Sequence, residues 1–140
     1  MDIADDLVYL RIALTNMCDG FSSSNSSKMV NLSIRTKILF LLSRGDQTPT
    51  ELISALCIAK SNLVNTMKPM IEEGAVVSYR HEDNSKNIYY RLAGKGVEEL
   101  KEYKNRLNSQ YSYVCRGSEE QVSSKIKELT KLIREKIDLC

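Results

Sequence analysis

Side chains that could bind a nucleic acid gather in one short stretch, residues 59–80, which reads AKSNLVNTMKPMIEEGAVVSYR. An asparagine can hydrogen-bond both edge atoms of an adenine, and a lysine can reach guanine or a phosphate. The polar residues here that could contact DNA are Lys60, Ser61, Asn62, Asn65, Thr66 and Lys68. The apolar residues between them recur at helical spacing and are expected to face a core: Leu63, Val64, Met67, Met70 and Ile71. The stretch predicts an amphipathic helix, although the polar side of a helix is more often simply solvated.

Cysteine and histidine offer little other chemistry. The four cysteines are 39, 58 and 25 residues apart, and His81 is the only histidine. Without a Cys-x-x-Cys pair, no local metal site is expected. No bound cofactor is expected either. The thiols are expected to be reduced, with Cys57 buried. A redox role is a second hypothesis: Cys18 and Cys115 lie next to predicted helix ends and Cys140 is terminal, so two of them could meet across a dimer.

Enzymatic motifs are missing from the sequence. It contains no Gly-rich phosphate loop, no nucleophile elbow and no metal-binding motif. His81 precedes a polar turn and is expected to be a surface residue. The sequence therefore predicts a protein that is not an enzyme.

Composition favours a small cytoplasmic protein. The 140 residues fit one domain, or one small domain with added helices, and 42% of them are hydrophobic. No apolar run approaches the roughly 20 residues needed to cross a bilayer, so no membrane association is expected. The start, MDIADDL, is acidic and unlike a signal peptide. Residues 31–96 hold nine basic and six acidic groups, a net charge of +3, which would favour an anionic partner.

Three helices are predicted in the middle of the chain. Ser33 is a good N-cap for a helix that ends at Gly45, with Ile34, Ile38, Leu41 and Leu42 facing inward. Thr48, Pro49 and Glu51 form a capping box with proline at the first helical position. The third helix is the stretch at residues 60–74, in which Pro69 should bend the axis.

Two strands are expected next, at residues 75–80 and 88–92, because these segments are rich in Val, Ile and Tyr. The polar segment EDNSKN, at 82–87, is expected to form the turn between them. Helices then follow Gly96 and Ser118. A helix-turn-helix followed by a hairpin is a winged helix, whose second helix enters the major groove while the hairpin, or wing, contacts the flanking backbone. The candidate wing contacts are Arg80, Lys86 and Arg91.

Apolar stripes mark both ends of the chain. Their residues are spaced by four or three positions, and they comprise Ile3, Leu7, Leu10 and Leu14 in one helix and Val122, Ile126, Leu129, Ile133 and Ile137 in the other. An exposed seam of this kind would be a liability in a monomer, whereas pairing across a two-fold axis would bury it. The sequence therefore predicts a mostly α-helical homodimer: an N-terminal dimerisation helix at 1–20, a winged helix-turn-helix at 32–96 and C-terminal dimerisation helices at 97–140.

The middle of the chain, roughly residues 32–107, resembles the MarR family of transcription regulators. The family's helix end appears as MIEEGAVV, and its motif after the second wing strand appears as RLAGKG, with Ala93 in place of the usual threonine. The family's wing arginine has no counterpart in DNSK, Asp83 to Lys86. The resemblance implies a dimer with interlocking terminal helices that represses genes until a small ligand or an oxidant binds. PadR-like and other winged-helix regulators share these motifs.

The sequence-based interpretation is thus a dimeric, sequence-specific DNA-binding regulator, with a repressor as the expected form. Its double-stranded site should be nearly palindromic. The alternative is a winged helix that binds another protein. A metal sensor of the ArsR type would need paired thiols in its helix-turn-helix, where ALCIAK offers one.

Overall fold

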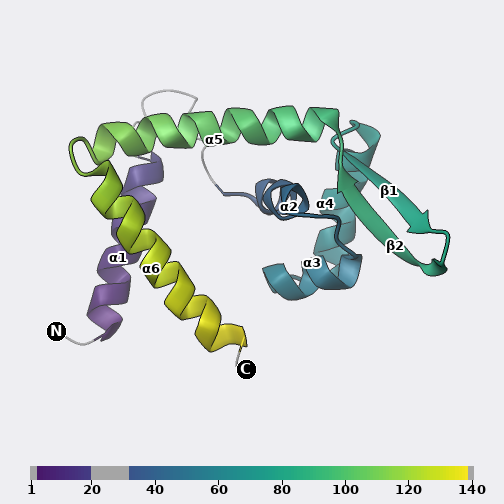
Figure 1. Cartoon of the computed structure of the whole chain (residues 1–140), viewed down its shortest axis with the longest axis horizontal. Helices are drawn as coiled ribbons and strands as arrows, with labels where there is room; N and C mark the ends of the chain where they lie inside the picture. Colours follow the sequence, from purple (N-terminus) through teal and green to yellow (C-terminus); the bar gives the residue numbers. More distant parts are fainter. Residues whose placement is uncertain (1–2, 20–31, 139–140) are drawn as a thin grey trace. The chain divides into compact units, whose positions relative to one another are not determined.

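The computed structural model describes residues 3–19 and 32–138 of the 140-residue chain. Within these residues the elements follow one another as α1, α2, α3, α4, β1, β2, α5 and α6 (Figure 1). They form two compact units, one within residues 29–105 and the other within 1–28 and 106–140. The long helix α5, Gly94–Val114, contributes to both. Helices with a two-stranded hairpin confirm the predicted fold class, a mostly α-helical winged helix.

The first two helices of the 29–105 unit begin at the predicted caps. Helix α2, Ile34–Ser43, starts after Ser33, whose hydroxyl accepts a hydrogen bond from the Thr36 amide at 3.1 Å. Helix α3, Pro49–Leu56, starts after Thr48, whose hydroxyl accepts from the Glu51 amide at 3.1 Å. Each cap satisfies one of the amides that the first helical turn leaves without a partner.

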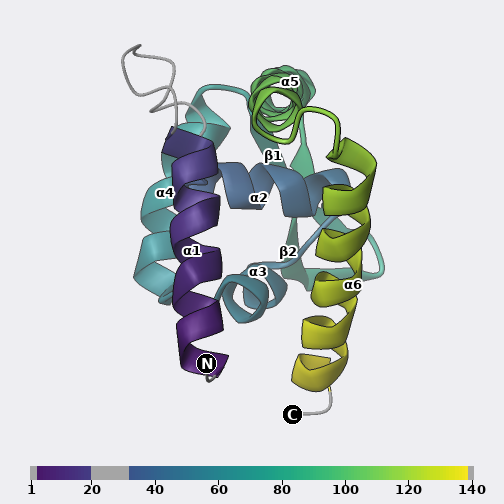
Figure 2. The same cartoon turned by 90° about the vertical axis from the view of Figure 1, so that its left-hand side faces the viewer.

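Helix α4, Lys60–Glu72, follows after a three-residue connection and contacts both α2 and α3 (Figure 1 and Figure 2). Its N-cap, Ala59, provides no side-chain hydrogen bond. The helix continues through Pro69 to Glu72. Gly74 then takes a φ of +83°, a conformation that glycine adopts without steric cost.

The wing is an antiparallel hairpin of β1, Val76–His81, and β2, Asn84–Leu92. The predicted turn at 82–87 was too long, because β2 already begins at Asn84. The regular register pairs Val76 with Leu92 and Arg80 with Ile88, and it shifts between Arg80 and His81. Backbone bonds also join Gln47 to Tyr90 on β2, with N···O distances of 3.2 and 2.8 Å. The α2–α3 connection therefore holds the base of the wing.

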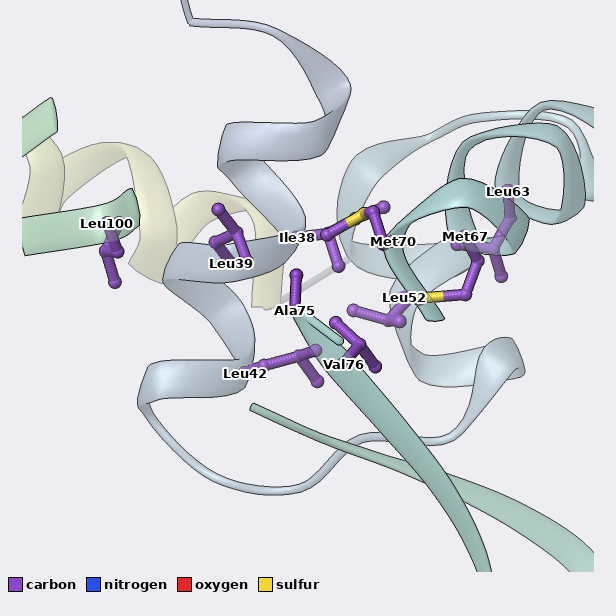
Figure 3. Close-up of a cluster of buried hydrophobic side chains, with 10 residues drawn as sticks. All are labelled: Ile38, Leu39, Leu42, Leu52, Leu63, Met67, Met70, Ala75, Val76 and Leu100. Atoms are coloured by element: carbon purple, nitrogen blue, oxygen red, sulfur yellow. The ribbon is translucent and has the colours of Figure 1, made fainter. Parts of the chain in front are cut away.

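The core of this unit contains ten buried apolar residues, whose side chains converge from α2, α3, α4, the start of the hairpin and α5 (Figure 3). They are Ile38, Leu39, Leu42, Leu52, Leu63, Met67, Met70, Ala75, Val76 and Leu100. Leu39 was not among the predicted core residues, yet it is fully buried. Two predicted core residues of α4 are instead exposed, Val64 by 52% and Ile71 by 38%. The buried stripe of α4 is therefore narrower than its apolar composition suggests.

The start of α5 lies against the hairpin more closely than a side chain would allow. A Cβ atom at Gly96 would lie 2.3 Å from the Ala75 carbonyl oxygen and 2.7 Å from a Leu92 methyl group. Helix α5 begins at Gly94, so Gly96 is inside it, not before it as the sequence pattern suggested. Glycine at this position lets α5 pack directly on the backbone of the wing's first residues.

Arg35 joins three helices of the unit on their surface. Its Nε and Nη2 donate to the two carboxylate oxygens of Glu99 on α5, both at 2.8 Å. Its Nη2 also lies 2.7 Å from Glu73, the C-cap of α4. These bonds raise the pKa of the guanidinium, with Glu99 as the larger cause. A cation at this position also offsets the negative charge that collects at the end of α4.

The other unit combines α1, Ile3–Asp19, the end of α5, and α6, Glu119–Asp138. The α5–α6 turn is tied by Tyr111, whose hydroxyl donates to the Glu119 carbonyl, and by the Gly117 amide, which donates to the Glu119 carboxylate at 3.1 Å. Gly117 has a φ of +86°. Helix α6 follows Ser118, as predicted.

Candidate nucleic-acid interface

Helix α4 presents a continuous polar face to solvent. Lys60, Ser61, Asn62, Asn65 and Lys68 are all exposed. The face opposite the core is formed by residues 61, 65 and 68, which lie one turn apart. Asn62 flanks this face, and Lys60 is the first helical residue. A helix with such a face and a packed opposite side is suited to lie in the major groove of DNA.

Thr66 occupies a different position from the other predicted contacts. It is half-buried, at the border between the polar face and the core residues Leu63 and Met70. Thr66 therefore lies at the edge of the candidate interface.

The first turn of α4 is suited to an anion. Because Ala59 supplies no side-chain cap, the first amides are left to other partners, and the positive end of the helix dipole lies here. Lys60 and Ser61 add a charge and a hydroxyl at the same end. A backbone phosphate is the natural ligand for such a group of donors.

The two wing arginines lie on opposite faces of the hairpin. Arg80 pairs with Ile88 and Arg91 pairs with Val77, and alternate pairs in a ladder face opposite sides. Both side chains are exposed. The structure therefore does not bring Arg80 and Arg91 together. Lys86 is exposed near the start of β2, beyond the register shift.

Arg91 is part of a polar cluster with Asp46 and Tyr79. Its Nη2 lies 3.0 Å from the Asp46 carboxylate and its Nε donates to the same oxygen at 3.1 Å. Its guanidinium also lies 4.6 Å from the centre of the Tyr79 ring, a cation–π contact. The Tyr79 hydroxyl donates to Asp46 as well. Arg91 therefore helps to hold the wing to the α2–α3 connection.

The electrostatics of this cluster favour an ionised Asp46. The hydrogen bond from Tyr79, followed by the bond and charge of Arg91, lowers the pKa of the Asp46 carboxyl below its ordinary value. The same hydrogen bond raises the pKa of Tyr79. The cluster is thus in its bonded form throughout the neutral range.

Aromatic side chains lie on the face of the hairpin that carries Arg91, between Arg91 and the wing tip. The rings of Tyr79 and Tyr89 stack with centroids 5.7 Å apart, and His81 meets Tyr89 edge-on at 4.6 Å. Cross-strand aromatic pairs stiffen a two-stranded ribbon, which is only marginally stable alone. His81 is exposed, as predicted.

The predicted dimerisation residues lie in the 1–28 and 106–140 unit. Most of those described are exposed: Ile3, Leu7, Leu10, Ile126, Leu129 and Ile133. Val122 is half-buried. The side chains of Leu14 and Ile137 lie outside the described residues. A cavity of about 800 Å³ lies between α1 and α6, lined by residues that include Leu10, Val122 and Leu129.

The cysteines differ from the sequence-based expectation at one position. Cys57 is exposed, not buried, because it is the C-cap of α3 in a left-handed conformation with a φ of 53°. Cys115 is half-buried and lines the α1–α6 cavity. The side chain of Cys18 and the whole of Cys140 lie outside the described part of the chain.

Within 3–19 and 32–138, no three His, Cys, Asp or Glu side chains are grouped so that they could hold a metal ion. None of the helices in these ranges has the length and apolar character that a membrane crossing requires.

Fold and exposed face together define a winged helix-turn-helix protein. Solved structures of transcription regulators have a similar fold. The transcriptional regulator PA4135 aligns with a TM-score of 0.69 and 17% identity, over 96% of this chain and 97% of that chain. Apo MarR from E. coli aligns with a TM-score of 0.69 and 12% identity, over 94% and 97% of the two chains.

A third structure, a mutant of S. aureus MepR bound to an oligodeoxyribonucleotide, has a TM-score of 0.61 and 14% identity, over 92% of this chain and 96% of that one. No protein-family model matches the sequence, and no curated protein does. The chain therefore has the fold of the MarR-type regulators along nearly its whole length.

Proposed function

We propose that this protein is a MarR-type transcription regulator that binds double-stranded DNA in a sequence-specific manner. The observation that carries the proposal is the exposed polar face of α4, on a helix-turn-helix with a wing. Support comes from the shared fold of PA4135 and MarR, and from the MepR structure with bound oligodeoxyribonucleotide. Such a protein has no catalytic role and acts in the cytoplasm.

Each element has a distinct task in the proposed complex. Asn62 and Asn65 read base edges in the major groove, while Lys60 and Ser61 bind phosphate at the start of α4. Thr66 and Lys68 contact the groove's border. Lys86, together with Arg80 or Arg91, binds the backbone or the minor groove beside it. Because Arg80 and Arg91 face opposite sides of the wing, the two side chains would not join in a single contact.

The proposed regulator is a homodimer. Helix α1, within residues 1–20, and the helices within 97–140 form its dimerisation domain, and residues 32–96 bind DNA. The exposed apolar side chains of α1 and α6 support this, since a partner subunit would cover them. A two-fold dimer presents two α4 helices to a near-palindromic site with half-sites about 10 base pairs apart.

Regulation is proposed to be repression that a small ligand or an oxidant relieves. For the oxidant, Cys115 is the one described thiol among Cys18, Cys115 and Cys140. Peroxide should then lower DNA affinity and produce a disulfide detectable by mass spectrometry. Unchanged affinity without any disulfide would remove the oxidant hypothesis.

Selection of bound sequences from a random DNA pool tests the function directly. A regulator should enrich one near-palindrome, and its affinity should fall as salt increases because phosphate contacts release counterions. Enrichment of no sequence, together with binding that ignores salt, would favour the alternative function, a winged helix that binds another protein.

A further inference from the structure

Val64 does not belong to the core of its unit. Its side chain is 52% exposed, whereas Leu63, Met67 and Met70 on the same helix are 0–2% exposed. It lies one turn after Lys60 and Ser61, one turn before Lys68, and next to Asn65. A β-branched residue also forms helix less readily than the polar residues common on solvated faces. An exposed apolar group therefore lies beside the polar face of α4, outside the core.

Only one base carries an apolar group into the major groove. That group is the C5-methyl of thymine, and apolar side chains recognise it by direct contact. Resting on the DNA-binding function proposed above, we propose that Val64 reads the C5-methyl group of one thymine in each half-site. The half-site then combines an adenine bound by Asn65 with a thymine contacted by Val64.

The charges on α4 distinguish Val64 from the other exposed apolar residues nearby. Val64 lies between Lys60 and Lys68, which would draw that part of the helix toward phosphates. Ile71, 38% exposed, is instead followed by Glu72 and Glu73, whose carboxylates would repel DNA phosphates. Val77 is 45% exposed but belongs to the hairpin, where it pairs with Arg91. Val64 is thus the apolar side chain best placed to enter the groove.

Replacement of thymine by deoxyuridine removes that methyl group and leaves every hydrogen-bonding atom in place. In the selected operator, each thymine is replaced in turn, symmetrically in both half-sites. For the wild-type dimer, one replacement should weaken binding about fourfold per half-site, or roughly 16-fold in all, as expected for one buried methyl group. In Val64→Ala the same replacement should change affinity by less than about twofold, because the partner methyl groups are gone.

Val77→Ala is the matched control, since it deletes the same atoms from an exposed valine outside α4, and it should keep the wild-type response. Should circular dichroism show that Val64→Ala is unfolded, Val64→Thr keeps the side-chain shape and should still reduce the response. The inference is overturned if all thymine replacements are neutral, or if the loss persists unchanged in the Val64 variant; specific binding to the selected site would then leave the proposed function intact. Selection of no sequence at all would remove both.

Discussion

Asn65 and Lys86 are expected to make different kinds of DNA contact. Asn65 lies on the outer face of α4 and Lys86 lies on the wing, and both are exposed. Asn65→Ala should cost about 1–3 kcal/mol on the preferred site and relax its sequence preference, because a bidentate base contact is lost. Fluorescence anisotropy with preferred and random duplexes would measure both effects.

Lys86→Ala should weaken binding to all sequences nearly alike. It should also reduce the salt slope by roughly one per protomer, about two per dimer, since one phosphate contact is lost from each. Titrations at several salt concentrations would measure this. If Asn65→Ala lowered affinity equally on both duplexes while Lys86→Ala altered preference, the two roles would be reversed.

Asp46 should make the stability of the fold depend on pH below about 4. Its pKa is lower in the folded chain than in the unfolded one, so its ionised form stabilises the fold. That contribution is present above the unfolded value, roughly pH 4, and is lost as the pH falls through the folded value. Asp46→Asn should therefore lower the Tm by about 2–4 °C at pH 7, and the difference should shrink toward pH 3. Thermal unfolding followed by circular dichroism between pH 3 and 7 would measure it.

The matched control for this titration is Asp83→Asn, which removes a carboxylate from the exposed turn at the wing tip and should leave the Tm nearly unchanged at pH 7. Tyr79→Phe should reproduce part of the Asp46 effect, because it removes the hydroxyl donor and keeps the ring under Arg91. A Tm difference between wild type and Asp46→Asn that stayed constant down to pH 3 would contradict the assignment.

At the scale of elements, the contact between α5 and the wing depends on a missing side chain. Gly96→Ala would place a methyl group 2.3 Å from the Ala75 carbonyl oxygen, which belongs to the backbone and can yield little. The variant should be destabilised by about 1–3 kcal/mol, as for other overpacked sites, and urea unfolding would measure the loss.

Gly94→Ala provides the comparison for that variant. It lies in the same helical turn, and a Cβ atom there would meet nothing within 4 Å. Alanine also favours the helix, so this variant should be neutral or more stable by up to about 1 kcal/mol. Equal losses at Gly94 and Gly96 would show that helix geometry, not the close approach, decides the effect.

At the scale of the whole molecule, the terminal helices should decide the oligomeric state. The full-length chain is expected to sediment as a dimer at micromolar concentration, because pairing would cover the exposed apolar residues of α1 and α6. Deletion of residues 118–140 should abolish tight operator binding. A full-length monomer that still bound its operator tightly would contradict this prediction.

Local chemistry allowed the sequence to determine much of the winged unit. The Ser33 and Thr48 caps, the proline at the start of α3 and the glycine after α4 each act within a few residues of chain, so their effects can be predicted without knowing the fold. The polar face of α4 could be predicted too, since helical spacing alone places residues 61, 65 and 68 together.

Only the tertiary structure decided which apolar residues are buried. The same spacing admitted Val64 and Ile71 to the core, but α2 and α3 cover a narrower stripe of α4 than its composition suggests. The approach of α5 to Ala75, which requires glycine at position 96, joins segments about 20 residues apart. Asp46, Tyr79 and Arg91 come together from a loop and two strands. Such contacts join residues that are distant in the sequence and depend on how the elements pack against one another. Local sequence patterns therefore do not predict them.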